Sequence, residues 1–130
     1  TSQSNNALEG LRILLVEDQL LIALEAEDIL LRHGAHSVSP TASSADALLL
    51  LDALDFDCAV LDVNLGDGTS LPVAEELTRR RIPYVFATGY GEAELISPNS
   101  VSAPFIRKPY EAAGLIGLLK SLFIPPKISG

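Results

Sequence analysis

The sequence predicts an α/β protein with a doubly wound parallel sheet, and three observations lead to this prediction. Four short apolar runs, bounded by turn residues, and one further strand-type segment at 37–41 alternate with helix-type patterns along the 130 residues. Hydrophobic residues make up 48% of the chain and charged residues 20%, which is typical of an ordered globular domain. Each of the four apolar runs leads into a residue whose side chain could handle a phosphoryl group. Ligand sites of open α/β sheets lie at such carboxyl ends of strands.

The apolar runs have the length of short parallel strands with both faces covered. For five strands, the usual doubly wound order is the flavodoxin-like 2-1-3-4-5, with helices on both faces of the sheet. This order places the first strand beside the third and leaves the second at one edge. The end of that second strand carries only Pro40 and Thr41 and no charged residue. The predicted strands are 12–17, 37–41, 58–62, 84–88 and 105–107.

Apolar residues at helical spacing between the strands predict four helices. Pro72 fits the third helix because proline is tolerated in a first helical turn. One more helix after Tyr90 has room for at most about two turns before Pro98. The four well-defined helices are predicted at 20–32, 45–54, 71–80 and 111–123.

Length and composition indicate one domain and exclude several classes of protein. We expect the domain at 10–124, between an N-terminal lead-in or linker at 1–9 and a tail at 125–130. The net charge of -8 argues against binding to nucleic acid. The one cysteine, Cys58, opens an apolar run and cannot form an intramolecular disulfide. Because neither a signal peptide nor a run of about 18 apolar residues is visible, we expect a cytoplasmic protein without a membrane span.

Five side chains with phosphoryl or metal chemistry follow the ends of four predicted strands: Glu17 and Asp18, Asp62, Thr88, and Lys108. Two carboxylates about 4 Å apart repel by roughly 4 kcal/mol at an effective dielectric near 20, and a bound cation would relieve that repulsion. Carboxylate oxygens without nearby Cys or His favour Mg²⁺ or Mn²⁺ over zinc. With an ammonium and a hydroxyl facing the cation, the set suits phosphoryl transfer, with Asp62 as candidate nucleophile. Taken alone, each residue has a structural alternative: helix capping for Glu17 and Asp18, a turn for Asp62, a backbone contact for Thr88 and a solvated surface cation for Lys108.

In this order and spacing, the residues resemble the receiver domains of two-component response regulators over about residues 11–123. The resemblance implies that Asp62 accepts a phosphoryl group from a histidine on a partner protein. It further implies that Asp18, Asp62 and the backbone carbonyl of Asn64 hold the metal, and that Glu17 supports it through water.

The same resemblance gives roles to residues nearer the C-terminus. Thr88 would reach toward the phosphoryl group and Lys108 would pair with it. Phe105 matches an aromatic position whose rotation is coupled to Thr88, and the bond from Lys108 to Pro109 is expected to be cis. The stretch 86–92 looks like the signature of a receiver subclass with Phe-Ala-Thr-Gly. Gly66 stands where a proline is frequent, so we expect a looser loop there.

The helix predicted at 20–32 carries a second apolar face. Ile22, Ala26, Ile29 and Leu30 have the spacing of a buried face. On nearly the opposite side lie Leu20, Leu24 and Leu31, which we name the leucine stripe. Singly exposed leucines are ordinary, but three aligned beside the acidic residues are a candidate docking site for the phosphodonor protein.

The sequence therefore predicts a Mg²⁺-dependent phosphorelay domain that catalyses only its own phosphorylation and dephosphorylation. Its expected partners are a histidine kinase or a histidine phosphotransfer protein and a downstream protein, reached by contact or by onward phosphotransfer; a homodimer is compatible. A terminal receiver of a hybrid kinase is the nearest alternative. A phosphatase similar to haloacid dehalogenases would need a carboxylate at Asn64, and a flavodoxin-type module would need a phosphate loop in place of Glu17 and Asp18.

Overall fold

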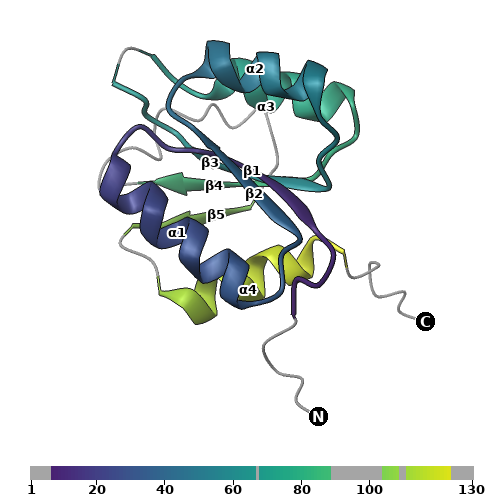
Figure 1. Cartoon of the computed structure of the whole chain (residues 1–130). Helices are drawn as coiled ribbons and strands as arrows, with labels where there is room; N and C mark the ends of the chain where they lie inside the picture. The colour runs from purple at the N-terminus through teal and green to yellow at the C-terminus, as the bar shows by residue number, and fades with distance from the viewer. Residues whose placement is uncertain (1–6, 67, 89–103, 109–110, 124–130) are drawn as a thin grey trace, which may run out of the picture.

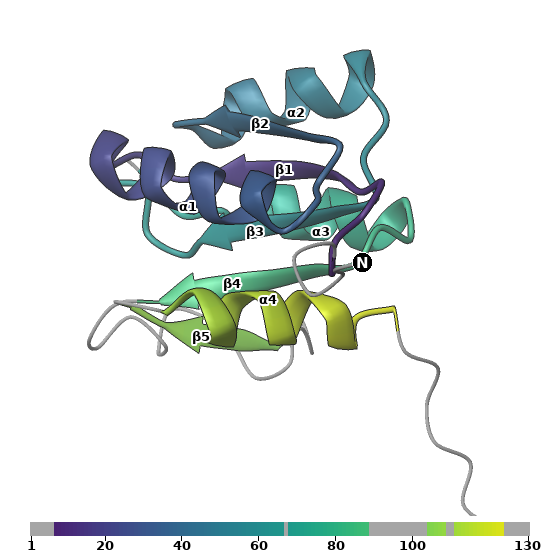
Figure 2. The same ribbon diagram turned by 60° about the horizontal axis from the view of Figure 1, so that its bottom comes forward.

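The computed structural model describes residues 7–66, 68–88, 104–108 and 111–123. Five strands in these ranges form one parallel sheet in the order β2-β1-β3-β4-β5. Their arrowheads point to the same side in Figure 2. The predicted fold class and strand order are confirmed. The strands are β1 (Arg12–Val16), β2 (Ser37–Thr41), β3 (Cys58–Asp62), β4 (Tyr84–Thr88) and β5 (Phe105–Arg107), and the helices are α1 (Leu20–Arg32), α2 (Ser44–Ala53), α3 (Leu71–Arg79) and α4 (Ala112–Ser121).

Helices cover both faces of the sheet, with α1 and α4 on one side and α2 and α3 on the other (Figure 1). Successive residues of each strand point to opposite faces, so the sheet contributes to two cores. Ile13 and Leu15 of β1 pack with α1 and α4, whereas Leu14 and Val16 pack with α2 and α3. None of the helices in the described ranges combines the length and apolar character needed to cross a bilayer.

Central and edge strands differ in burial. Every residue of β3 and β4 is buried, and only Arg12 of β1 is not, whereas β2 and β5 contain no buried residue. The register aligns the strand ends at one edge: Val16 lies beside Leu61, and Asp62 lies beside Ala87. The carboxyl ends of the three central strands therefore open together at that edge.

Two helices end in the same hydrogen-bonded motif, each with a residue in the left-handed region. After α1, Gly34 (φ 102°) donates to Leu31, and the next amide donates to Leu30. After α3, Arg81 (φ 63°) donates to Thr78, and the next amide donates to Leu77. This paired pattern is the Schellman motif, which usually places glycine at the left-handed position. The motif turns the chain back into β2 and β4.

The segment before β1 contributes to the core. Leu8 is buried and packs in the cluster beneath α1 and α4. Its amide donates to the carbonyl of His33 over 2.8 Å. The domain boundary at residue 10 stays a prediction, but Leu8 belongs to the packed structure. The short helix expected after Tyr90 lies outside the described residues.

Candidate functional site

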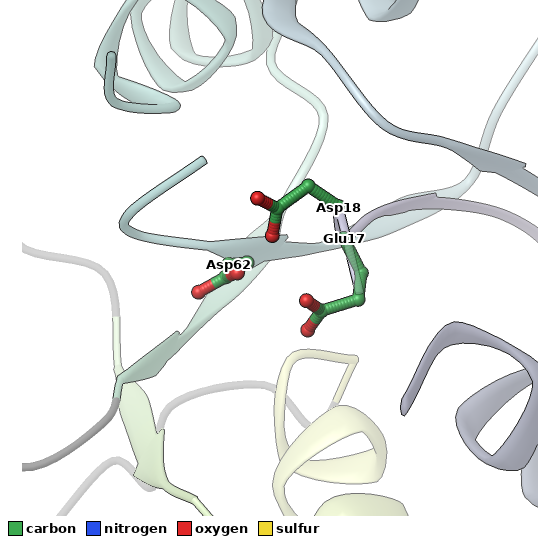
Figure 3. Close-up of side chains that lie close together, drawn as sticks. All are labelled: Glu17, Asp18 and Asp62. Carbon is green, nitrogen blue, oxygen red and sulfur yellow. The ribbon is translucent and has the colours of Figure 1, made fainter. Parts of the chain in front are cut away.

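The carboxyl edge of the sheet gathers three carboxylates. Glu17 and Asp18 directly follow β1, and Asp62 is the last residue of β3, the neighbouring strand. One oxygen from each side chain lies within 4.8 Å of the others. Figure 3 shows the three side chains turned toward a common space. The sequence placed these residues at one edge, and the structure brings them within the span of a single cation's ligand shell.

Lys108, which directly follows the edge strand β5, reaches this acidic cluster. Its Nζ lies 2.8 Å from Glu17 Oε1 and 3.2 Å from Asp62 Oδ1. The side chains of Lys108, Glu17 and Asp62 are only 14%, 3% and 3% exposed. Because β5 stands three positions from β1, about 14 Å along the sheet, only a long side chain can bridge that gap. The lysine therefore supplies a buried counter-charge for two of the three carboxylates.

The pKa of Asp62 is raised to about 7, first by burial and then by the negative charge of Glu17. Lys108 opposes this shift without cancelling it. Burial tends to lower the pKa of Lys108, but its hydrogen bond to Glu17 and the charge of Asp62 raise it overall. The lysine is thus held in its charged form, and the phosphoacceptor candidate is poised between its two states near neutral pH.

Two buried oxygens of the site have no hydrogen-bond partner among the described residues: Asp62 Oδ1 and Thr88 Oγ1. The 3.2 Å contact from Lys108 to Asp62 Oδ1 is therefore an ion pair without hydrogen-bond geometry. Thr88 ends β4 and is fully buried. Unpaired buried polar atoms are costly, and an excess of carboxylates over cations adds to that cost. Both features fit a site that receives a hard divalent cation and an anionic group.

Glu17 also fixes the start of α1. Its Oε2 accepts the Gln19 amide at 3.1 Å while Oε1 faces Lys108. The sequence analysis gave Glu17 only an indirect role at the metal. These two contacts connect the start of α1 to Lys108, which follows β5, and sequence spacing does not reveal that connection; the metal role of Glu17 stays a prediction.

The loop between β3 and α3 contains Asn64, whose carbonyl was predicted as a metal ligand. Asn64 forms an antiparallel bridge with Thr69, and its side-chain oxygen accepts the Gly66 amide at 3.0 Å. The Leu65 amide donates to Gly68 over 2.9 Å. The loop was expected to be loose at Gly66, but its described part is hydrogen-bonded within itself. The ligand role of the Asn64 carbonyl stays a prediction.

The remaining predicted residues lie around this edge. Phe105 is the first residue of β5 and is half exposed; its coupling to Thr88 stays a prediction. All three residues of the leucine stripe are exposed, and the neighbouring Leu21, which the sequence analysis did not include, is exposed too. Pro109 and most of the stretch 86–92 lie outside the described residues.

The buried face of α1 differs from the expected one by one residue. Ala26, Ile29 and Leu30 are buried as predicted, but Ala23 takes the place of Ile22, which is only partly buried. An alanine gives a weak signal in an apolar pattern, so its burial was not anticipated.

Comparisons with known proteins identify the family. The profile of the response regulator receiver domain matches residues 13–120. The transcriptional regulatory protein TcrA of Mycobacterium tuberculosis is 28% identical over 119 residues, covering 88% of this chain and 47% of TcrA. The aerobic respiration control sensor protein ArcB of Escherichia coli is 36% identical over 73 residues, covering 56% of this chain and 9% of ArcB. The chain spans less than half the length of these curated relatives.

Solved structures agree with the profile. The solution structure of SdrG from Sphingomonas melonis Fr1 is 37% identical, with a TM-score of 0.72, and covers 91% of this chain and 98% of its own. A response regulator receiver protein from Sinorhizobium medicae is 26% identical, with a TM-score of 0.78 over 88% of this chain and 95% of its own. On the sheet order, the acidic cluster with its lysine, and these matches, the chain belongs to the response regulator receiver domain family of two-component systems.

Proposed function

We propose that this domain accepts a phosphoryl group from a partner histidine onto Asp62 in a metal-dependent step. The observation that supports this most is the Asp62 carboxylate: buried, facing Lys108 at 3.2 Å, and with Oδ1 lacking a hydrogen bond. An Asp62 oxygen attacks the phosphorus, a new P–O bond forms, and the P–N bond to the histidine breaks. The electron pair returns to the imidazole, and the product is an aspartyl phosphate.

The residues around Asp62 would bind the metal and contact the phosphoryl oxygens. Glu17, Asp18 and Asp62, with the carbonyl of Asn64, would hold Mg²⁺ or Mn²⁺, which would neutralise charge on the phosphoryl oxygens. The unpaired hydroxyl of Thr88 would donate to one of those oxygens, and the Lys108 ammonium would pair with another. Of these groups, Asp62 Oδ1 and Thr88 Oγ1 have no hydrogen-bond partner among the described residues.

The leucine stripe is the proposed contact for the phosphodonor, a histidine kinase or histidine phosphotransfer protein. α1 begins two residues after Asp18, so its first turn, which carries Leu20, adjoins the acidic cluster. Leu24 and Leu49 are 50% and 66% exposed, but Leu49 lies on α2, on the opposite face of the sheet (Figure 1). Leu24→Glu should slow transfer from the donor protein and spare labelling by acetyl phosphate. Leu49→Glu is the matched control; equal loss in both variants would contradict the docking role.

The signal would leave the domain by protein contact or by onward phosphotransfer, within the cytoplasm. The match to ArcB, a sensor protein, supports a second candidate: the receiver of a hybrid histidine kinase. Both candidates use the same chemistry at Asp62. They differ in the protein that supplies the phosphoryl group.

Intact-mass measurement after incubation with acetyl phosphate tests the chemistry. We expect a gain of one phosphoryl group in wild type with Mg²⁺, no gain in Asp62→Asn, and no gain in EDTA. The adduct should be labile in base, as expected of an acyl phosphate. A gain of equal size in Asp62→Asn would place the modification elsewhere and contradict the proposal.

A further inference from the structure

The open side of Gly66, in the loop after β3, faces the carboxylate of Asp18. Its backbone has φ +85°, a conformation that L side chains rarely adopt. A Cβ added at Gly66 would lie 3.2 Å from Asp18 Oδ2. Such a contact is closer than ordinary packing allows, so one of the two groups would have to move.

The loop has little freedom to retreat from Asp18. Beyond the Asn64–Thr69 bridge, the Ser70 amide donates to Val63 over 3.1 Å. Ser44 of α2 donates its hydroxyl to the Thr69 carbonyl over 2.9 Å, which ties the loop to a neighbouring helix. These hydrogen bonds, together with that from the Gly66 amide to Asn64, restrain the described part of the loop.

The Asp18 side chain, by contrast, is free to move. It is exposed, and within the described part of the chain no hydrogen bond or ion pair restrains its carboxylate. A methyl group at Gly66 would therefore displace the Asp18 oxygen rather than the loop, and would change its spacing from Glu17 and Asp62.

We propose that Gly66 is a positioning residue: because it has no side chain, the loop can lie against Asp18 and set where that carboxylate meets the metal. This inference rests on the proposed metal site. Mg²⁺ requires near-ideal octahedral geometry at about 2.0–2.1 Å, whereas Ca²⁺ accepts longer and more variable bonds. A displaced Asp18 should therefore weaken Mg²⁺ binding more than Ca²⁺ binding.

Isothermal titration of Mg²⁺ and Ca²⁺, without any phosphodonor, tests the inference with three alanine variants. Gly66→Ala introduces both the strained backbone and the contact. Gly10→Ala has a similar φ of +82° but no atom within 4 Å of its Cβ, and Gly68→Ala likewise meets nothing. We expect Gly66→Ala to lose about tenfold in Mg²⁺ affinity and distinctly less in Ca²⁺ affinity, while both controls bind as wild type does.

Gly66→Asn tests the same contact with a residue that fits the left-handed backbone, so that weak Mg²⁺ binding is not caused by unfolding. Asparagine tolerates the left-handed region but keeps a Cβ, so it should restore thermal stability and still bind Mg²⁺ weakly. Wild-type Mg²⁺ affinity in Gly66→Ala, or equal loss for both cations, would overturn the positioning role. If the wild type itself bound no Mg²⁺, the metal site of the proposed function would fail and the inference with it.

Discussion

At the amino ends of β1 and β3, Arg12 and Asp57 satisfy each other, whereas at the carboxyl ends Lys108 faces more negative charge than it can balance. Arg12 donates to Asp57 from its backbone amide at 2.8 Å and from Nε at 3.0 Å, and the Asp57 amide donates back to Arg12 at 2.8 Å. These contacts lower the pKa of Asp57, with the Arg12 side-chain hydrogen bond as the main cause. The pair stabilises the folded chain and leaves its charges partly in water.

The carboxyl end uses the same kinds of group to opposite effect. Three carboxylates face one ammonium, which leaves a formal charge of -2 when all are ionised. The pKa of Asp62 is raised where that of Asp57 is lowered. The carboxyl ends therefore carry an excess of negative charge that a bound cation could neutralise, at a cost in stability, whereas the Arg12–Asp57 pair at the amino ends stabilises the fold.

Removing a carboxylate should change stability in opposite directions at the two ends of the sheet, and the larger change is expected at Asp62. In the folded chain Asp62 stays protonated up to about pH 7, whereas in the unfolded chain its carboxyl group loses the proton near pH 3.8. Wild-type stability should therefore fall as pH rises through that window. In metal-free buffer at pH 8 we expect Asp62→Asn to be more stable than wild type by about 2–4 kcal/mol, and equal to it below pH 4. Urea unfolding at both pH values measures the difference; a less stable variant at pH 8 would contradict it.

Adding Mg²⁺ should reduce the electrostatic repulsion among the three clustered carboxylates. At a Mg²⁺ concentration of 100 times the dissociation constant, the free energy of unfolding should rise by about 2.7 kcal/mol. The rise should be much smaller in Asp62→Asn, which lacks one of the three clustered carboxylates. The urea midpoint should move while the slope of the transition stays constant. An equal rise in both proteins would show that Mg²⁺ acts elsewhere.

The amino end should respond with the opposite sign. Asp57→Asn should cost about 1 kcal/mol at pH 7, because the ion pair with Arg12 is lost while one hydrogen bond can remain. Since the folded pKa of Asp57 is lowered, its contribution is present above 3.8 and is lost as pH falls through the folded value. Urea unfolding at pH 7 and pH 2 should show the difference shrinking. Greater stability of Asp57→Asn at pH 7 would remove the contrast between the two ends.

Backbone strain at Arg81, near the amino end of β4, should change the free energy of unfolding by less than the substitutions above. Arg81 occupies the left-handed position of a Schellman motif where α1 has Gly34. Arg81→Gly should raise stability by about 0.5–1 kcal/mol, because relief of the left-handed strain exceeds the added entropy of the unfolded chain. Gly34→Ala should lower stability by a similar amount. Thermal unfolding of the two variants should give shifts of opposite direction, and equal directions would be inconsistent with this account.

Much of the fold was predictable because its signals are local. Four strands, β2 to β5, have the bounds that their apolar runs predicted, and β1 is one residue shorter. The helices agree to within two residues at each end. The burial of Leu8 was not predictable, since a lone leucine in a polar segment has no periodicity to indicate which face it joins.

The candidate site was predictable as a set but not in its contacts. Parallel strand order alone placed Glu17, Asp18 and Asp62 at one edge, and the structure brings them within 4.8 Å. The contact between Glu17 and Lys108 joins residues on strands three positions apart. The distance between Lys108 Nζ and Glu17 Oε1 depends on the twist of the sheet and the length of both side chains, and sequence spacing gives no information about it.

Local sequence patterns are enough to predict the alternation of strands and helices, the edge of the sheet that carries the candidate site and the residues that form it. These follow from apolar periodicity and from turn residues, which act over a few positions along the chain. Three features depend on tertiary packing: Lys108 lies between Glu17 and Asp62, burial raises the pKa of Asp62 to about 7, and a Cβ at Gly66 would lie 3.2 Å from Asp18 Oδ2. Burial and close approach arise from distant segments packed together, and local patterns carry no measure of that distance.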